Sequence, residues 1–70
     1  MVEMIKVQSS NLDSVGYDEE TKILTIKFHN GTYKYSKVPK RIFLGLLNAS
    51  SKGKYHHDFI KDNYPYRKIA

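Results

Sequence analysis

The stretch LTIKFHNGTYKY, residues 24–35, determines how the rest of the chain can fold. Two segments of alternating apolar and polar residues flank the dipeptide Asn30-Gly31. This dipeptide is typical of a two-residue type I′ hairpin turn, because both central positions of that turn need a positive φ. The turn predicts a hairpin with these opposed pairs: His29 with Thr32, Phe28 with Tyr33, Lys27 with Lys34, and Ile26 with Tyr35.

The predicted hairpin has two chemically different faces, because side chains alternate across a strand. The apolar face comprises Leu24, Ile26, Phe28, Tyr33 and Tyr35. The polar face comprises Thr25, Lys27, His29, Thr32, Lys34 and Ser36. This contrast is typical of an antiparallel sheet that packs on one side and meets water on the other.

A further strand is expected before the hairpin, over residues 12–17. The loop that follows contains Asp18 and Thr21, whose side chains can bond backbone N–H groups across a turn. This loop resembles the one that closes the second hairpin of the immunoglobulin-binding domain of streptococcal protein G. The resemblance implies two opposed pairs that extend the apolar face: Tyr17 with Leu24, and Val15 with Ile26.

Two helices are expected after the strands. Pro39 is tolerated in the first turn of a helix, and residues 39–49 carry one apolar stripe. The stripe comprises Ile42, Phe43, Leu46, Leu47 and Ala49, whereas Leu44 points away from it. Ser50 or Ser51 can cap a second helix over residues 52–63, which has to end before Pro65.

These elements predict an α+β fold: a three-stranded antiparallel β-meander with two helices packed on one face. The strands are expected near residues 12–18, 22–29 and 32–38. Residues 1–8 would form a tail or an edge extension, 9–66 the domain, and 67–70 a C-terminal tail. The predicted core comprises Val15, Tyr17, Leu24, Ile26, Phe28, Tyr33, Tyr35, Phe43, Leu46 and Leu47.

Length and composition indicate a single small globular domain of 70 residues. The chain has no cysteine, which excludes disulfides, thiolate zinc sites and a cysteine nucleophile. No apolar run is long enough for a signal peptide or a membrane span, so we expect a cytoplasmic protein without a membrane partner. The formal net charge of +5 favours an acidic partner, with nucleic acid first and an acidic protein second.

An ordered series of landmarks resembles the KTSC domain, which is found at the C-terminus of some lysyl-tRNA synthetases and as small freestanding bacterial and phage proteins. The central landmark is Tyr33-Lys34-Tyr35, and the resemblance covers residues 9–66. The others are Ser9-Ser10-Asn11, Gly16-Tyr17-Asp18, Leu24, Ile26, Phe28, Gly31, Val38-Pro39, Leu46-Leu47, Ala49, Ser51, Gly53, Tyr55, Ile60 and Tyr64.

The resemblance implies no assigned activity for this family, although the synthetase context suggests RNA binding. One position departs from the family pattern. His56 stands where an aromatic residue is expected after Tyr55, which predicts looser packing of the second helix.

Two surfaces could bind nucleic acid. Tyr33 and Tyr35 could stack on bases, but the hairpin register places both on the apolar face and favours a role in the core. Basic residues could instead contact phosphates, although lysine and threonine are also normal on a solvated sheet face. The candidate cations are Lys27, Lys34, Lys37, Lys40, Arg41, Lys52, Lys54, Arg67 and Lys68.

No catalytic or metal site is expected. His56-His57-Asp58 lacks the spacing of a metal motif, because adjacent histidines point to different sides of a helix. The serines lack the strand-turn-helix setting of a nucleophile, and the chain has no glycine-rich phosphate loop. We therefore expect a non-enzymatic binding module without a cofactor. Its partner would be RNA or another nucleic acid. Alternatively, the chain would be a protein-interaction module, such as a small bacterial or phage accessory protein, whose open sheet face or sheet edge meets an acidic protein.

Overall fold

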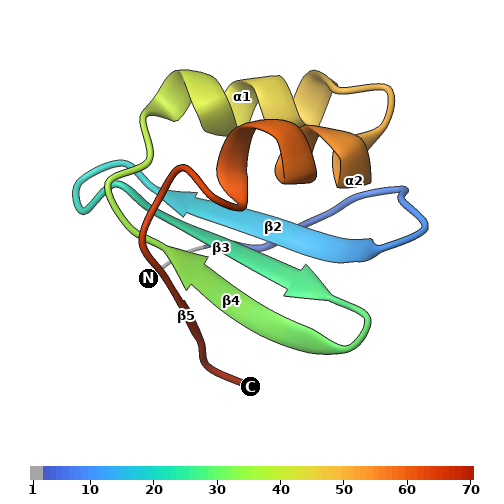
Figure 1. Ribbon diagram of the computed structural model, residues 1–70, viewed down its shortest axis with the longest axis horizontal. Coiled ribbons are helices and arrows are strands. Elements are labelled where there is room, and N and C mark those ends of the chain that lie inside the picture. Colours follow the sequence, from blue (N-terminus) through green and yellow to red (C-terminus); the bar gives the residue numbers. More distant parts are fainter. Residues whose placement is uncertain (1–2) are drawn as a thin grey trace.

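The computed structural model, which describes residues 3–70, contains a five-stranded antiparallel sheet with its helices on one side (Figure 1). The strands lie in sequence order: β1 (Ile5–Lys6), β2 (Leu12–Asp18), β3 (Ile23–Phe28), β4 (Gly31–Tyr35) and β5 (Tyr66–Lys68). The helical segments are α1 (Lys40–Asn48), α2 (Lys52–Tyr55) and the π-helical turn η1 (His56–Ile60). None of the helices in residues 3–70 has the length and apolarity needed to cross a membrane.

The α+β class is confirmed, but the prediction of three strands is wrong. The short strand β1 pairs with the outer edge of β2. Strand β5 pairs with β4 and lies in the segment that the sequence assigned to an extended tail. Further backbone bonds continue this ladder on both sides of β5, from Ser36 N–H to the Pro65 carbonyl and from Ile69 N–H to the Thr32 carbonyl.

The β2–β3 hairpin has the expected register. Val15 pairs with Ile26, and Tyr17 pairs with Leu24. The Asp18 carboxylate accepts hydrogen bonds from the backbone N–H groups of Glu20 and Thr21, at 3.0 and 3.3 Å. The local chemistry of this turn therefore determines the register, as proposed.

The predicted register of the β3–β4 hairpin is wrong by two residues. Phe28 pairs with Gly31, Ile26 with Tyr33, and Leu24 with Tyr35. The turn thus occupies His29-Asn30, and no residue of this turn and no glycine in residues 3–70 has a positive φ. Because side chains alternate with a period of two, the shift leaves every residue on its predicted face.

Gly31 is explained by close packing instead of turn geometry. A Cβ atom at this position would lie 3.0 Å from Lys68 Cε and 3.2 Å from the Ala70 carbonyl oxygen. The absent side chain lets the C-terminal segment approach the start of β4, where Thr32 N–H bonds to that carbonyl. The glycine therefore serves the β4–β5 contact, which no local pattern shows.

The core lies between the apolar sheet face and the helices. Of the predicted core residues, Val15, Leu24, Ile26, Tyr35, Phe43 and Leu46 are buried. Tyr17, Phe28, Tyr33 and Leu47 are partly buried and pack against this cluster. Three buried apolar residues within residues 3–70 were not in the predicted set: Leu12, Val38 and Ile60.

Both helices begin near the predicted positions. Pro39 immediately precedes α1, and the Ser51 hydroxyl accepts a hydrogen bond from Lys54 N–H at the start of α2. The helix then continues through the π-helical turn η1 to Ile60, which is fully buried. This arrangement holds His56, the first residue of η1, beneath β3 and β4, where its ring contacts Phe28 and Tyr35.

We expect Tyr35→Ala to reduce the free energy of unfolding by about 3–5 kcal/mol, as other buried aromatic truncations do. Tyr35 is only 3% exposed, and its ring contacts those of Tyr33, His56 and Tyr66. Urea denaturation followed by circular dichroism measures the change. Leu44→Ala is the control, since Leu44 is 44% exposed and should lose less than about 0.5 kcal/mol. Equal losses in the two variants would contradict the assignment of Tyr35 to the core.

Candidate functional site: a basic sheet face and an aromatic cleft

Four cations share the sheet face opposite the helices, and we call this surface the basic sheet face: Lys6, Lys27, Lys34 and Arg67. Lys6 and Lys27 flank Ser14 across β1, β2 and β3. Lys34 pairs directly with Arg67 across β4 and β5. The predicted pairing of Lys27 with Lys34 is wrong, because the register shift places Lys27 opposite Thr32 and Lys34 opposite Thr25.

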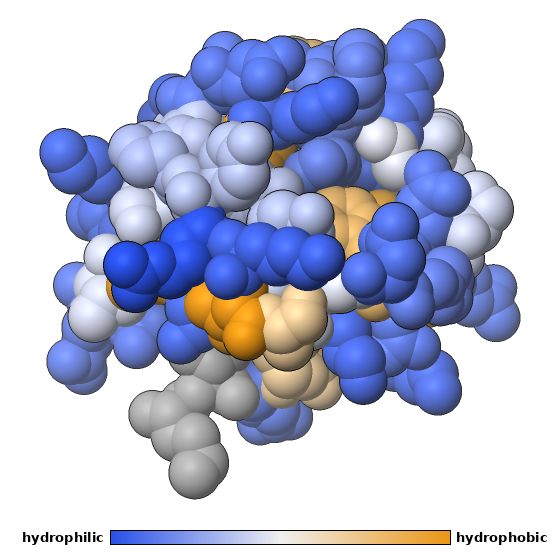
Figure 2. Space-filling view, turned by 60° about the horizontal axis from the view of Figure 1, so that its bottom comes forward, coloured by the Kyte–Doolittle hydropathy of each residue, from blue (hydrophilic) through white to orange (hydrophobic). Residues whose placement is uncertain are grey.

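Small uncharged residues lie between these cations. Ser14 and Thr25 are buried. Gly16 is the β2 partner of Thr25 and lies on the same face. In the part of the chain that the structure describes, none of the four cations lies within ion-pair distance of a carboxylate. Figure 2 turns this side of the molecule forward and shows a mostly hydrophilic surface with a small apolar group. The basic sheet face is thus an exposed surface with uncompensated positive charge.

The other predicted cations lie elsewhere. Lys40 forms an ion pair with Glu19 at 2.7 Å, and Lys52 donates to the Ala49 carbonyl at 3.1 Å. Lys37 and Arg41 lie near the start of α1, and Lys54 lies in α2. Lys68 pairs with Tyr33 and therefore lies on the helix side of the sheet, opposite to Arg67. The predicted set does not form one continuous binding surface.

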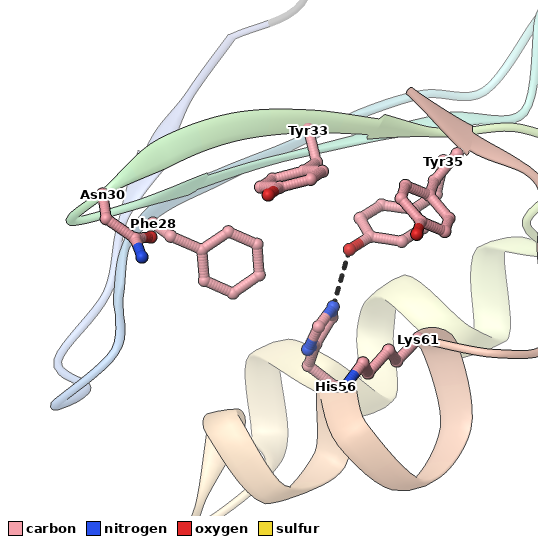
Figure 3. A pocket seen from close by; sticks show the side chains of 7 residues that line it. Phe28, Asn30, Tyr33, Tyr35, His56 and Lys61 are labelled. Atoms are coloured by element: carbon pink, nitrogen blue, oxygen red, sulfur yellow. Dashed lines mark hydrogen bonds between the residues drawn. The ribbon is translucent and has the colours of Figure 1, made fainter. Parts of the chain in front are cut away.

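An aromatic cleft opens between the sheet and η1, with a volume of about 240 Å³. Its lining comprises Phe28, Asn30, Tyr33, Tyr35, His56, Lys61 and Tyr66. Figure 3 shows the tyrosine rings under the sheet, Phe28 beside them and His56 rising from the helix below. The β3–β4 hairpin, η1 and β5 are far apart in the sequence and meet here, so strand patterns alone could not locate the cleft.

One hydrogen bond joins the two sides of the cleft. Tyr35 Oη and His56 Nε2 are 2.7 Å apart. Burial lowers the pKa of His56, and the nearby Lys61 and His57 lower it further. Burial also raises the pKa of Tyr35 to about 12, with Tyr33 and Tyr66 adding to the effect. A neutral imidazole and a neutral phenol are therefore favoured, and the phenol donates to Nε2 when the imidazole proton is on Nδ1.

The predicted site lacked Asn30, His56, Lys61 and Tyr66 of the cleft lining and Lys6 of the basic sheet face. The expectation that His56 loosens the second helix is wrong, because its ring lies 4.9 Å from Phe28 and 5.5 Å from Tyr35, edge to face. His57 is exposed and faces Asp58 instead. Among residues 3–70 no group of three or more metal-ligating side chains occurs. The signal for His56 was its spacing from Ile60, which places both on the sheet-facing side of one helix.

The fold and these two surfaces define a small α+β domain with an aromatic cleft on one side of its sheet and a basic face on the other. The family model of the KTSC domain matches residues 8–64. The chain belongs to the KTSC family. A crystal structure of a KTSC domain protein from Yersinia pestis has 37% sequence identity, covers both chains completely and gives a TM-score of 0.96.

Relatives of two kinds are similar to this chain. An uncharacterized protein from Stutzerimonas stutzeri is 39% identical over 67 residues, which cover 93% of this chain and 94% of that protein. A lysine–tRNA ligase from a Nostoc species is 37% identical over 68 residues, which cover 96% of this chain. The chain spans only 12% of the length of that ligase.

We expect the free energy of unfolding to decrease as the pH falls below about 6.5, the pKa of an unperturbed histidine. The sign follows from the lowered pKa of His56, since the unfolded chain binds a proton at a higher pH than the folded chain does. The stabilisation by neutral His56 is complete above the pKa that His56 has in the unfolded chain. It is lost as the pH falls through the lower pKa of His56 in the folded chain. Urea midpoints at a series of pH values measure it. His56→Phe should remove this dependence of the urea midpoint on pH, whereas His57→Gln should keep it, because His57 is exposed. An unchanged pH dependence in His56→Phe would refute its assignment to His56.

Proposed function

We propose that this chain is a non-enzymatic RNA-binding module that contacts the phosphate backbone through its basic sheet face. The observation that carries the proposal is the direct cross-strand pairing of Lys34 with Arg67. Like charges in opposed positions destabilise a sheet, and no carboxylate in residues 3–70 lies within ion-pair distance of either. A phosphate bound between the two side chains would offset their mutual repulsion.

The basic sheet face suits contact with the RNA phosphate backbone without recognition of individual bases. Between the cations the sheet face presents Gly16 and the buried Ser14 and Thr25, so a phosphodiester chain could approach these strands closely, whereas the exposed Ile69 lies at the β5 edge of the same face. Each neutralised phosphate releases counterions, which makes the affinity depend on salt and little on sequence. Three or four contacts would give a slope of log K against log salt of about −2 to −3 for a single strand.

The relatives support RNA over DNA as the partner. Several similar proteins are named lysine–tRNA ligase, and by that name they act on a tRNA. The matched region is 12% of the length of each ligase. This proposal retains the cytoplasmic location expected from the sequence.

The decisive prediction concerns Lys34→Gln combined with Arg67→Gln. This double variant should weaken binding of labelled single-stranded RNA by at least about tenfold at low salt and make the salt slope shallower by about 1 to 1.5. Fluorescence anisotropy at several salt concentrations measures both quantities. The fold should be unaffected, since both side chains are exposed.

Arg41→Gln combined with Lys54→Gln is the matched control, because it removes the same charge from exposed helix positions. It should leave most of the affinity intact. Equal losses of RNA affinity in the two double variants would mean that only the net charge matters. That result would refute the assignment of RNA binding to the basic sheet face. Absence of RNA binding at low salt, together with capture of an acidic protein, would replace RNA binding by protein interaction.

A further inference from the structure

We infer that the aromatic cleft holds one unpaired nucleobase of a bound strand, with a neighbouring phosphate held by the lysines at its rim. This inference rests on the proposed function and names a second contact that it does not require. The basic sheet face would hold the backbone, and the cleft would hold a base.

The walls of the cleft suit a flat ring. Figure 3 shows Tyr33 with the face of its ring toward the cavity, and Phe28 stands nearly perpendicular to it, at 83° and 5.6 Å between centroids. Tyr66 lies 6.0 Å from Tyr33 at the open side and is 60% exposed. Base stacking on such rings is the usual way in which proteins bind single strands.

The volume of the cleft also limits the occupant. At about 240 Å³ it is smaller than the pockets of drug-sized ligands, which measure about 300–1,000 Å³. One planar ring system fits such a space. The cleft therefore suits a base that has left the stack.

Unused polar groups lie where the edge of a base would meet the protein. The Asn30 amide lines the cleft and forms no hydrogen bond within residues 3–70. His56 uses Nε2 for Tyr35, which leaves Nδ1 without a partner in the described residues. That nitrogen is not sealed in the core, since no buried side-chain nitrogen or oxygen in residues 3–70 lacks a partner. An amide and an imidazole N–H together offer a donor and acceptor pattern to a base.

Charge favours a nucleotide over an aromatic side chain of a protein partner. Lys61 lines the cleft, and Lys68 pairs with Tyr33 on the same side of the sheet. No carboxylate belongs to the lining, and neither lysine has an ion-pair partner in residues 3–70. A phosphate attached to the base would complement both cations, whereas a tyrosine or phenylalanine side chain brings no negative charge.

Strand β5 links the two contacts. It is an edge strand, and its successive residues point to opposite faces, so Tyr66 lies at the cleft and Arg67 on the basic sheet face. A single strand that crosses the β5 edge could therefore place one base against Tyr66 and a nearby phosphate against Arg67. A rigid duplex could not make both contacts, since its bases are stacked and paired.

The test titrates the full chain with each of the four ribonucleoside 5′-monophosphates and follows the side-chain NMR signals of His56 and Tyr66. At least one monophosphate should bind in the millimolar range or tighter and shift both signals. The nucleoside without phosphate should bind more weakly, and inorganic phosphate alone should leave the aromatic signals unmoved. Equal binding of inorganic phosphate would overturn the inference in favour of a plain anion site.

Matched variants locate the contact. Tyr66→Ala should weaken the monophosphate by about five- to a hundredfold, which is the range measured for lost base stacking. Lys61→Gln should weaken the monophosphate more than the nucleoside. The controls are Phe59→Ala and Lys54→Gln, since Phe59 packs on Tyr55 outside the cleft and both residues are exposed. Unchanged affinity in both cleft variants would refute the inference.

Two further arms keep the cleft and the sheet face separable. Lys34→Gln with Arg67→Gln should weaken the monophosphate much less than Tyr66→Ala does, even where it weakens the oligonucleotide. Oligonucleotide binding that survives this variant, together with monophosphate binding that is lost in Tyr66→Ala, would support base binding in the cleft. The same result would refute phosphate binding by the basic sheet face. N-acetyltyrosine amide serves as the protein mimic, and binding of this probe without any monophosphate would overturn the nucleotide assignment.

Discussion

The pairing of β4 with β5 is the contact on which both candidate surfaces depend. The last strand returns after two helices and adds to the free edge of the meander, next to Tyr33-Lys34-Tyr35. Gly31 permits this approach, because a side chain there would meet Lys68 and the Ala70 carbonyl. Without β5 the cleft would lose Tyr66 from its wall, and the opposite face would lose the Arg67–Lys34 pair.

The alternation of side chains along β5 gives this edge its chemistry. Tyr66 and Lys68 belong to the helix side, where rings and η1 enclose the cleft, and Arg67 belongs to the open side. The Tyr35–His56 hydrogen bond holds η1 against the sheet and keeps the two walls of the cleft together. One short strand therefore connects an aromatic site and a basic site that are separated by the thickness of a sheet.

Sequence reasoning found the β2–β3 register, the α+β class, the helix starts and the apolar face, because each depends on contacts close in the chain. It misplaced the Asn30-Gly31 turn by one position, since the two registers put the same residues on the same faces. It also took Arg67 and Lys68 for part of a tail, because the short segment after Pro65 carries too little pattern to indicate a strand. His56 was misjudged for a similar reason: its partners Phe28 and Tyr35 are distant in the chain.

The amino-acid sequence by itself determined which side chains face the helices and which face water, since the period of two in a strand is a local property. It also determined the excess of positive charge and the family. The tertiary structure alone decided which cations lie side by side and which rings enclose a cavity. Those arrangements depend on where β5 and η1 dock, and docking is governed by packing between residues that are remote in the chain.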